Sequence, residues 1–303
     1  MLKKILSLLI VLMITWTIVA CGGATEETQP EEGVFPTEIV MGFVPTAESD
    51  QIAGTVEPLA TRLSEILEVP VRGEVMTNFS ALVEGMGSGQ IHIGFLPGFG
   101  YVQGNERYGL EVILKSQRNG SDSYRAQFVV RADSGIEKLE DLRGKVWAFP
   151  DVASPAGYLF PAAHNVEKLD VTDVLNDFFE AAYQTGSHDN ALITVYNEEA
   201  DVATTYEDAR PLLENEYPDV METLKILDYT GAIPNDTISI IPELNEELKE
   251  KIKQAFLSFN GEPEMIQVMN EVYRWDGIME AEDSDYDIVR ETYNLFRDEI
   301  NLD

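Results

Sequence analysis

The chain has 303 residues, 44% of them apolar, so it can bury a sizeable core and is long enough for two domains. Its formal net charge is −33, from 54 acidic and 21 basic residues. Nucleic acid and anionic lipid both require a basic patch, so this charge argues against either as a partner.

The first 20 residues have the pattern of a secretory signal peptide. A positively charged start, Met1-Leu-Lys-Lys4, precedes an apolar run over 5–19. Ile18-Val-Ala-Cys21 has the sequence of a bacterial lipobox and contains the only cysteine. We therefore expect a signal peptide over 1–20 and lipidation of Cys21, which would anchor the mature chain on the extracytoplasmic side of the membrane. Residues 21–36 are almost free of apolar side chains and are predicted to form a disordered tether.

From residue 37 onward, strand and helix patterns alternate. We predict strands over 38–44, 69–75 and 90–95, with helices over 52–67 and 80–86 between them. This βαβαβ order predicts a parallel sheet with helices on its faces. Ligands bind such sheets beyond the carboxyl ends of the strands. The loops that follow these strands, 45–50, 77–80 and 96–101, should therefore face a ligand crevice.

The second half of the chain repeats this organisation. Strands are predicted over 108–116 and 124–131, followed by a short capped helix over 134–144. A second βαβ series starts at Lys145. From Leu244 to the end of the chain, the apolar residues recur at helical spacing.

The turn at 148–164 is the first strand-to-helix turn of the second series. Ser154 is placed as an N-cap and Pro155 at the first helical position. A strand that leads through a loop into a helix leaves backbone N–H groups pointing at open space, with the helix dipole behind them. This geometry binds anions.

Several short motifs resemble one known family. Their order and spacing along the chain are similar to those of the substrate-binding lipoproteins of phosphonate, phosphite and phosphate ABC transporters. The motifs are Asn78-Phe-Ser-Ala-Leu82, Gln90-Ile-His-Ile-Gly94, Ser123-Tyr-Arg-Ala126, Glu140-Asp-Leu-Arg-Gly144, Ala153-Ser-Pro-Ala-Gly-Tyr-Leu-Phe-Pro161, Gly186-Ser-His-Asp-Asn-Ala-Leu192, Ala200-Asp-Val-Ala203 and Ile233-Pro-Asn-Asp236.

The resemblance implies an α/β fold of the type 2 periplasmic-binding class, with two lobes that are each a mostly parallel sheet flanked by helices. Lobe 1 would comprise 37–123 plus 237–303 and lobe 2 would comprise 126–232, joined by crossing segments near 124 and 234. The resemblance also implies a small anion (phosphonate, phosphite or phosphate) bound between the lobes, ABC permease subunits as partners, no cofactor and a monomer.

The family's binding positions carry over one at a time. Two aromatic positions fall on Phe79 and Tyr124, and a histidine position falls on His188. A helix-start run of hydroxyl residues falls on Ser154, Pro155 and Ala156, with the N–H of Gly157 beside it. Two carboxylate positions fall on Asp208 and Asp236.

This chain departs from the family pattern at the cradle for the anion. Phe79 lacks a phenolic O–H, Pro155 lacks both a hydroxyl and an N–H, and Ala156 lacks a hydroxyl. The cradle would keep the Ser154 hydroxyl and the N–H groups of Ala156 and Gly157. Each neutral hydrogen bond contributes about 1 kcal/mol, so the loss of several donors would lower the affinity for a phosphonate. The identity of the ligand therefore stays open.

Three readings of the site follow. In the first, Asp208 or Asp236 accepts the O–H of a hydrogen phosphonate, or alternatively the ammonium group of an aminoalkyl ligand, and His188 changes charge near pH 6.5. In the second, His188, the two carboxylates and a tyrosine bind a metal cation. In the third, the protein is a ligand sensor of the same fold. No Gly-x-Ser-x-Gly, Walker or Gly-x-Gly-x-x-Gly motif is present, so we expect no enzyme activity.

Overall fold

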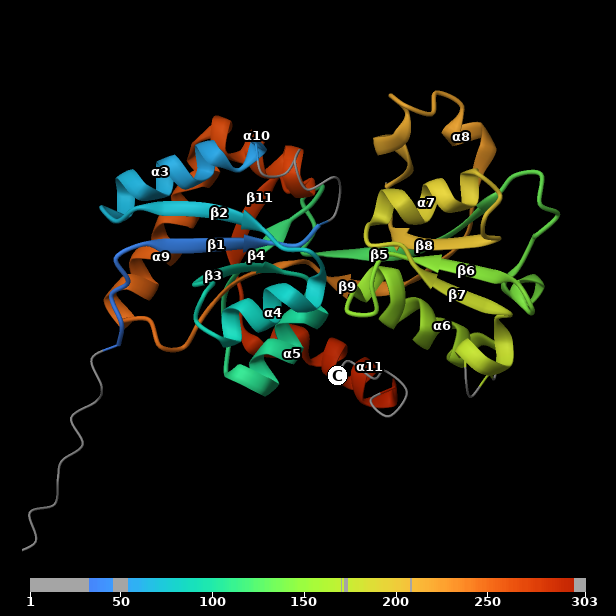
Figure 1. Cartoon of the computed structure of the whole chain (residues 1–303), viewed down its shortest axis with the longest axis horizontal. Coiled ribbons are helices and arrows are strands. Elements are labelled where there is room, and N and C mark those ends of the chain that lie inside the picture. Colours follow the sequence, from blue (N-terminus) through green and yellow to red (C-terminus); the bar gives the residue numbers. More distant parts are fainter. Residues whose placement is uncertain (1–32, 46–53, 170, 172–173, 208, 297–303) are drawn as a thin grey trace, which may run out of the picture. The chain divides into compact units, whose positions relative to one another are not determined.

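The computed structural model describes residues 33–45, 54–169, 171, 174–207 and 209–296 (Figure 1). The chain divides into two units, Met1–Gly33 and Val34–Asp303, and every helix and strand described below belongs to the second. The expected signal peptide, Cys21, most of the tether and Asp208 lie outside the described residues. None of the described helices has both the length and the apolar character needed to cross a bilayer.

The first sheet is mixed: two of its six strands run against the other four. Its strand order is β11 (Gly277–Glu280), β4 (Glu111–Gln117), β10 (Thr237–Ile240), β3 (Ile93–Leu96), β1 (Ile39–Phe43) and β2 (Val71–Val75). β1 pairs in parallel with β2 and β3, while β10 pairs antiparallel with both β3 and β4. All five residues of β1 are buried, as expected of a central strand covered on both faces.

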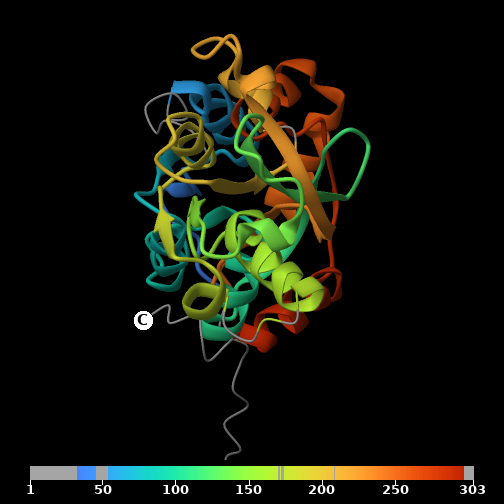
Figure 2. The same cartoon turned by 90° about the vertical axis from the view of Figure 1, so that its right-hand side faces the viewer.

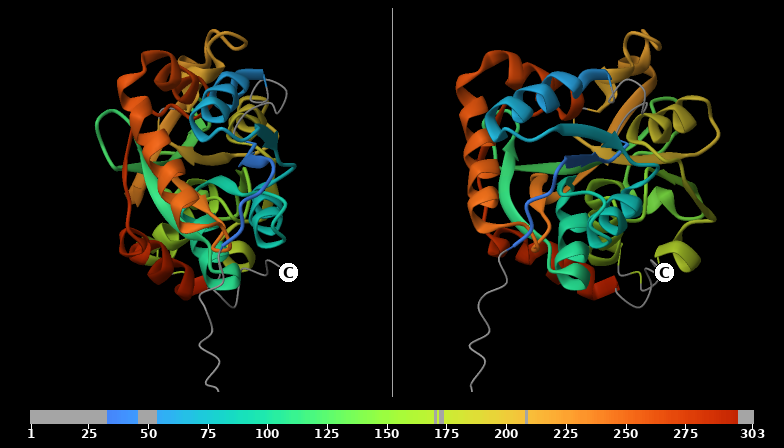
Figure 3. Two further views of the ribbon diagram at one scale, coloured as in Figure 1. Left: turned by 90° about the vertical axis from the view of Figure 1, so that its left-hand side faces the viewer. Right: turned by 60° about the vertical axis from the view of Figure 1, so that its left-hand side comes forward.

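Helices cover both faces of this sheet. α3 (Glu57–Leu67) and α10 (Pro263–Tyr273) lie on one face, and α4 (Phe79–Gly87) and α5 (Gly98–Tyr108) lie on the other (Figures 1 and 3). α9 (Glu246–Ser258) packs against α3, and α11 (Asp287–Phe296) packs against α5. Aromatic rings fill the core, where Phe95 stacks on Phe43 with centroids 4.5 Å apart and contacts Trp275 at 5.5 Å.

The second sheet has five strands, in the order β7 (Ala181–Gln184), β6 (Val146–Phe149), β8 (Val202–Tyr206), β5 (Ser123–Arg131) and β9 (Leu224–Pro234). Only β5 runs against the others. α6 (Phe160–Leu169) and α7 (His188–Tyr196) cover opposite faces, with the short helix α8 (Val220–Thr223) before β9 (Figure 2). The predicted fold class, an α/β fold with two sheets flanked by helices, is confirmed, although three of the five strand pairings in the first sheet are antiparallel.

The chain passes between the two sheets twice, from β4 to β5 and from β9 to β10. Asn235, which is fully buried, ties these two crossing segments together. Its Nδ2 donates to the carbonyls of Ser116, at 2.9 Å, and Ser121, at 2.8 Å. The N–H of Ser116 in turn donates to the carbonyl of Asp236 at 2.9 Å. The residues of both crossings are therefore fixed relative to each other.

The structure differs from the predicted elements in three places. The predicted helix over 134–144 is only a 3₁₀ turn, Leu139–Leu142, and the loop expected at 96–101 already begins α5 at Gly98. The C-terminal region, predicted to be helical throughout, contains β11. β11 pairs with β4 and has only four residues. In so short a segment, alternation of apolar and polar residues cannot be distinguished from a helical pattern.

Candidate functional site

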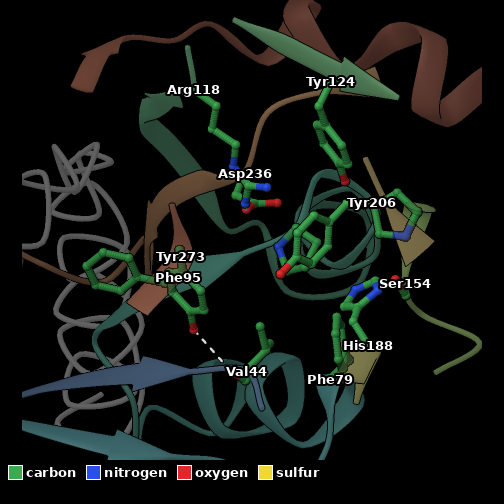
Figure 4. Close-up of a pocket in the computed structure, with 12 residues that line it drawn as sticks. Val44, Phe79, Phe95, Arg118, Tyr124, Ser154, His188, Tyr206, Asp236 and Tyr273 are labelled. Carbon is green, nitrogen blue, oxygen red and sulfur yellow. Dashed lines mark hydrogen bonds and ion pairs between the residues drawn. The ribbon is translucent and has the colours of Figure 1, made fainter. Parts of the chain in front are cut away.

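A small cavity lies where the two sheets meet the crossing segments, and we call it the inner cavity (Figure 4). It encloses about 30 Å³, enough for one or two water molecules. Elements of the first sheet contribute Val44, Phe79, Phe95, Pro97 and Tyr273. Elements of the second sheet contribute Ser154, Pro155, His188 and Tyr206, and the crossing segments contribute Arg118, Tyr124 and Asp236.

Ser154 begins the helical segment on one side of this cavity. Its side chain accepts the N–H of Gly157 at 3.0 Å, and Pro155 occupies the first helical position, so the predicted N-cap is confirmed. The segment is a π-helical turn, Pro155–Leu159, that continues into α6. With its oxygen used as acceptor, Ser154 still has an O–H to donate. The N–H of Gly157 is occupied by this cap, and neither Gly157 nor the buried Ala156 lines the cavity.

Hydrogen bonds from β6 and β8 hold this turn in position. Trp147 Nε1 donates to Thr204 Oγ1 at 2.8 Å, and the Thr204 hydroxyl donates to the carbonyl of Gly157. Only glycine fits at 157, because a Cβ there would lie 2.3 Å from Pro150 Cγ. The sequence therefore holds the Ser154 hydroxyl at a defined place.

His188 is the first residue of α7 and is buried. Its Nδ1 lies 2.8 Å from Thr205 Oγ1, and its ring contacts Tyr206 edge-on at 4.8 Å. Burial and the nearby Arg118 guanidinium lower the pKa of His188 to about 3. The imidazole is thus neutral at neutral pH, in contrast to the expected change of charge near pH 6.5.

Arg118 is the main residue that the sequence analysis missed. It belongs to a two-residue hairpin turn, in which Asn119 and Gly120 have φ values of 51° and 71°. Arg118 and Ser121 exchange backbone hydrogen bonds of 3.0 and 2.9 Å across the turn. Asn-Gly between two strands is a strong hairpin signal and could have located this turn at the crossing between the lobes.

The Arg118 side chain pairs with Asp236 at 2.5 Å. Figure 4 shows this pair on one side of the inner cavity and Ser154 and His188 on the other. The guanidinium lies over the rings of Tyr124 and Tyr206, at 5.3 and 5.4 Å from their centroids. Its Nε is buried and has no hydrogen-bond partner among the described residues. A buried donor without an acceptor costs stability unless a ligand or water supplies one.

Three tyrosines bring hydroxyl groups to the cavity wall. Burial raises the pKa of Tyr206 to about 12 and also raises the pKa of Tyr124 and of Tyr273, so all three are neutral. Tyr273 donates to the carbonyl of Val44 at 3.1 Å (Figure 4). Tyr206 and Tyr273 were not predicted, and they supply phenol groups to a cavity in which Phe79 has none.

The family model described as "ABC transporter, phosphonate, periplasmic substrate-binding protein" matches residues 41–286. The chain belongs to this family. Among curated relatives, it is 24% identical over 295 residues to the phosphate-import protein PhnD of Mycolicibacterium smegmatis, covering 89% of each chain. It is 25% identical over 228 residues to the phosphonates-binding periplasmic protein of Escherichia coli, covering 74% of this chain and 66% of the relative.

Solved structures share the fold of this chain. A binding-protein component of an ABC phosphonate transporter from Pseudomonas aeruginosa has a TM-score of 0.77 at 22% identity, covering 85% of this chain and 86% of that one. PhnD1 of Prochlorococcus marinus, solved with methylphosphonate, has a TM-score of 0.77 at 17% identity, covering 87% and 99%. The family consists of extracytoplasmic substrate-binding proteins of transporters and not of enzymes, and the resemblance seen in the sequence motifs is confirmed.

Six of the residues carried over from the family line the inner cavity together: Phe79, Tyr124, Ser154, Pro155, His188 and Asp236. Asp208 lies outside the described residues, and Tyr206, two positions earlier, lines the cavity. The two histidines not assigned to ligand binding lie elsewhere. His92 accepts the N–H of Val40 at 3.0 Å, and His164 contacts Asp228 at 3.0 Å.

The electrostatics of the inner cavity are balanced. Arg118 and Asp236 carry opposite charges, and His188 is neutral. Within the described part of the chain, no group of three or more His, Cys, Asp or Glu is placed to hold a metal ion. A cation that entered the cavity would be repelled by the Arg118 guanidinium, so this arrangement disfavours the hypothesis of a metal site.

Proposed function

We propose that this family member binds a phosphonate or a small phosphorus oxyanion in the inner cavity and delivers it to an ABC permease. The observation that carries the proposal is the buried, unpartnered Nε–H of Arg118 in the same cavity as the Ser154 hydroxyl and His188. The Arg118 Nε–H and the Ser154 O–H have no acceptor among the described residues, and His188, whose Nδ1 lies against Thr205 Oγ1, has Nε2 left for a ligand. Oxygen atoms of a phosphonate would satisfy them with charge-assisted hydrogen bonds of about 1.5–3 kcal/mol.

Asp236 has a different role here from the one expected of a free carboxylate. It pairs with Arg118, so a bound anion would meet one cationic and one anionic group at the same edge of the inner cavity. A hydrogen phosphonate can accept from Arg118 and donate its own O–H to Asp236. A fully deprotonated anion would be repelled by the carboxylate, which favours the protonated form. The relatives named for phosphate import and for phosphonate binding are consistent with this ligand class.

The size of the cavity supports a mechanism of opening and closing. A space of about 30 Å³ is too small for a methylphosphonate, so the ligand needs a more open form to enter. In this proposal lobe 1 (37–123 with 237–303) and lobe 2 (126–232) move about the crossing segments near 124 and 234. The protein acts as a monomer.

We also propose that Cys21 carries the lipid anchor of the mature protein. A Cys21→Ala variant should be found in the soluble fraction or accumulate unprocessed, while the wild type remains with the membrane. Cleavage at another position in a freely secreted wild type would contradict the anchor without affecting the ligand proposal.

A thermal-shift screen tests the ligand class. The compounds are methylphosphonate, 2-aminoethylphosphonate, phosphite, phosphate, sulfate, Mg²⁺ and Zn²⁺. A phosphorus compound at about 100 times its dissociation constant should stabilise the protein by about 2.7 kcal/mol, and sulfate and the metals should give no shift. Stabilisation by a metal alone would overturn the proposal.

A further inference from the structure

A second cavity of about 480 Å³ adjoins the inner cavity, and we call it the outer cavity. The two cavities share Arg118, Tyr124 and Tyr206 in their walls. The Arg118 guanidinium lies over both of these rings, so it stands at the boundary between the two spaces. A volume of this size accommodates an organic substituent of several atoms. A ligand whose phosphorus group occupies the inner cavity could extend past Arg118 into the outer one.

Some charged side chains of the outer cavity form ion pairs with other described residues, and others do not. Arg118 is paired with Asp236, and Glu207 accepts from the side chain of Arg125 at 2.9 Å and from its N–H at 3.0 Å. Arg274 and Asp276, which also line this cavity, have no side-chain hydrogen bond or ion pair with any described residue. These two therefore remain available to a ligand.

Arg274 differs from the other arginines that the structure describes. Every other arginine in the described part of the chain bonds to a carboxylate or a backbone carbonyl. The protein has 54 acidic and 21 basic residues, so partners for arginine are abundant. Arg274 instead ends α10 in a left-handed conformation, with φ of 60°, and its exposed side chain lines the outer cavity with no partner among the described residues.

We propose that the outer cavity binds a zwitterionic substituent of the ligand, with a carboxylate against Arg274 and an ammonium against Asp276. A purely anionic substituent would meet Asp276, and a purely cationic one would meet Arg274. A neutral substituent would pair with neither charge. The ligand class is then a phosphonate joined to an α-amino acid head. This inference rests on the proposed function, because it assigns the phosphorus group to the inner cavity.

Four compounds with the same carbon spacer test it by calorimetric titration. They are propylphosphonate, 3-aminopropylphosphonate, 4-phosphonobutyrate and 2-amino-4-phosphonobutyrate, which carry neither, one or both charged groups. The zwitterion should bind about tenfold more tightly than propylphosphonate. Arg274→Gln should weaken only the two carboxylate compounds, by about three- to tenfold, and Asp276→Asn only the two amino compounds. Gln keeps an unbranched side chain at the left-handed position, and Arg72→Gln on β2, outside both cavities, is the matched control.

The possible results separate this inference from the proposed function. If propylphosphonate binds and the charged groups add no affinity, the zwitterion assignment is wrong while the oxyanion site stands. If Arg274→Gln weakens all four compounds equally, Arg274 acts on the fold or on closure and the assignment is again wrong. If none of the four compounds binds, the zwitterion assignment is wrong, and the proposed function fails as well only if methylphosphonate, phosphite and phosphate do not bind either.

Discussion

The guanidinium of Arg118 and the carboxylate of Asp236 form an ion pair of 2.5 Å that joins the two segments connecting the sheets. Arg118 belongs to the hairpin between β4 and β5, and Asp236 lies between β9 and β10. Their side chains are only 13% and 14% exposed, and both line the inner cavity. One pair of residues therefore links the crossing segments, about which the lobes would move, to the place where we expect the ligand.

Removing one member of this pair should destabilise the fold. Arg118→Gln leaves the Asp236 carboxylate without its partner in a mostly buried place, at a cost of about 3 kcal/mol. Asp236→Asn should have a similar effect, because it leaves the guanidinium unpaired. The double variant should lose clearly less than the sum of the two single variants in urea unfolding. Strictly additive losses would show that the two side chains do not interact.

The pH dependence of stability should report on His188. Its pKa is about 3 in the folded protein and about 6.5 in an unfolded chain. Between these values the unfolded state binds more protons, so stability falls as the pH is lowered, by up to about 1.4 kcal/mol per pH unit. His188→Asn retains a group that can bond Thr205 and does not titrate. Unfolding measured from pH 7 to pH 4 should show the wild type losing stability faster than this variant, and parallel curves would contradict a buried neutral imidazole.

Ser154→Ala should have two separable effects. It removes the acceptor for the Gly157 N–H, which costs about 1 kcal/mol of stability, and the hydroxyl in the inner cavity, which should weaken phosphonate binding about fivefold. Asn245→Ala is the matched control, since Asn245 caps α9 by accepting from Glu247 N at 2.9 Å and does not line the cavity. It should lose similar stability and keep full affinity. If both variants lost affinity, the weaker binding would be a consequence of lower stability and not of the missing Ser154 hydroxyl.

Gly157→Ala should disturb the Ser154 turn directly. The added Cβ would lie 2.3 Å from Pro150 Cγ and 2.9 Å from Ser154 Oγ, so the turn or Pro150 must shift. Overpacking of this kind costs about 1–3 kcal/mol, and it should also weaken ligand binding because the capping hydroxyl moves. Gly54→Ala has open space around its Cβ and is the control. Unchanged unfolding and binding in Gly157→Ala would show that the close packing is not maintained in solution.

Local sequence signals predicted the Ser154 side of the site well. An N-cap followed by proline at the first helical position is decided by neighbouring residues, and the structure has both. The alternation of strands and helices likewise predicted the parallel pairing of β1 with β2 and β3. Such features depend on contacts within a few residues, which a single sequence displays.

The other side of the site depends on contacts between distant parts of the chain. Arg118 and Asp236 are 118 residues apart, and Tyr273 bonds to Val44 across 229 residues. No periodicity or cap indicates such pairs, so Arg118, Tyr206 and Tyr273 were missed. The neutral state of His188 was missed for the same reason, since its pKa is set by burial and by Arg118.

The most direct measurement is a calorimetric titration of methylphosphonate into the wild type and into Pro155→Ser. Pro155 lines the inner cavity at the start of the helix, and serine would add a hydroxyl and a backbone N–H there. We expect saturable one-to-one binding by the wild type and binding about fivefold to tenfold tighter by the variant. Absence of binding to methylphosphonate, phosphite and phosphate, or an affinity that Pro155→Ser leaves unchanged, would contradict an oxyanion site at this helix start.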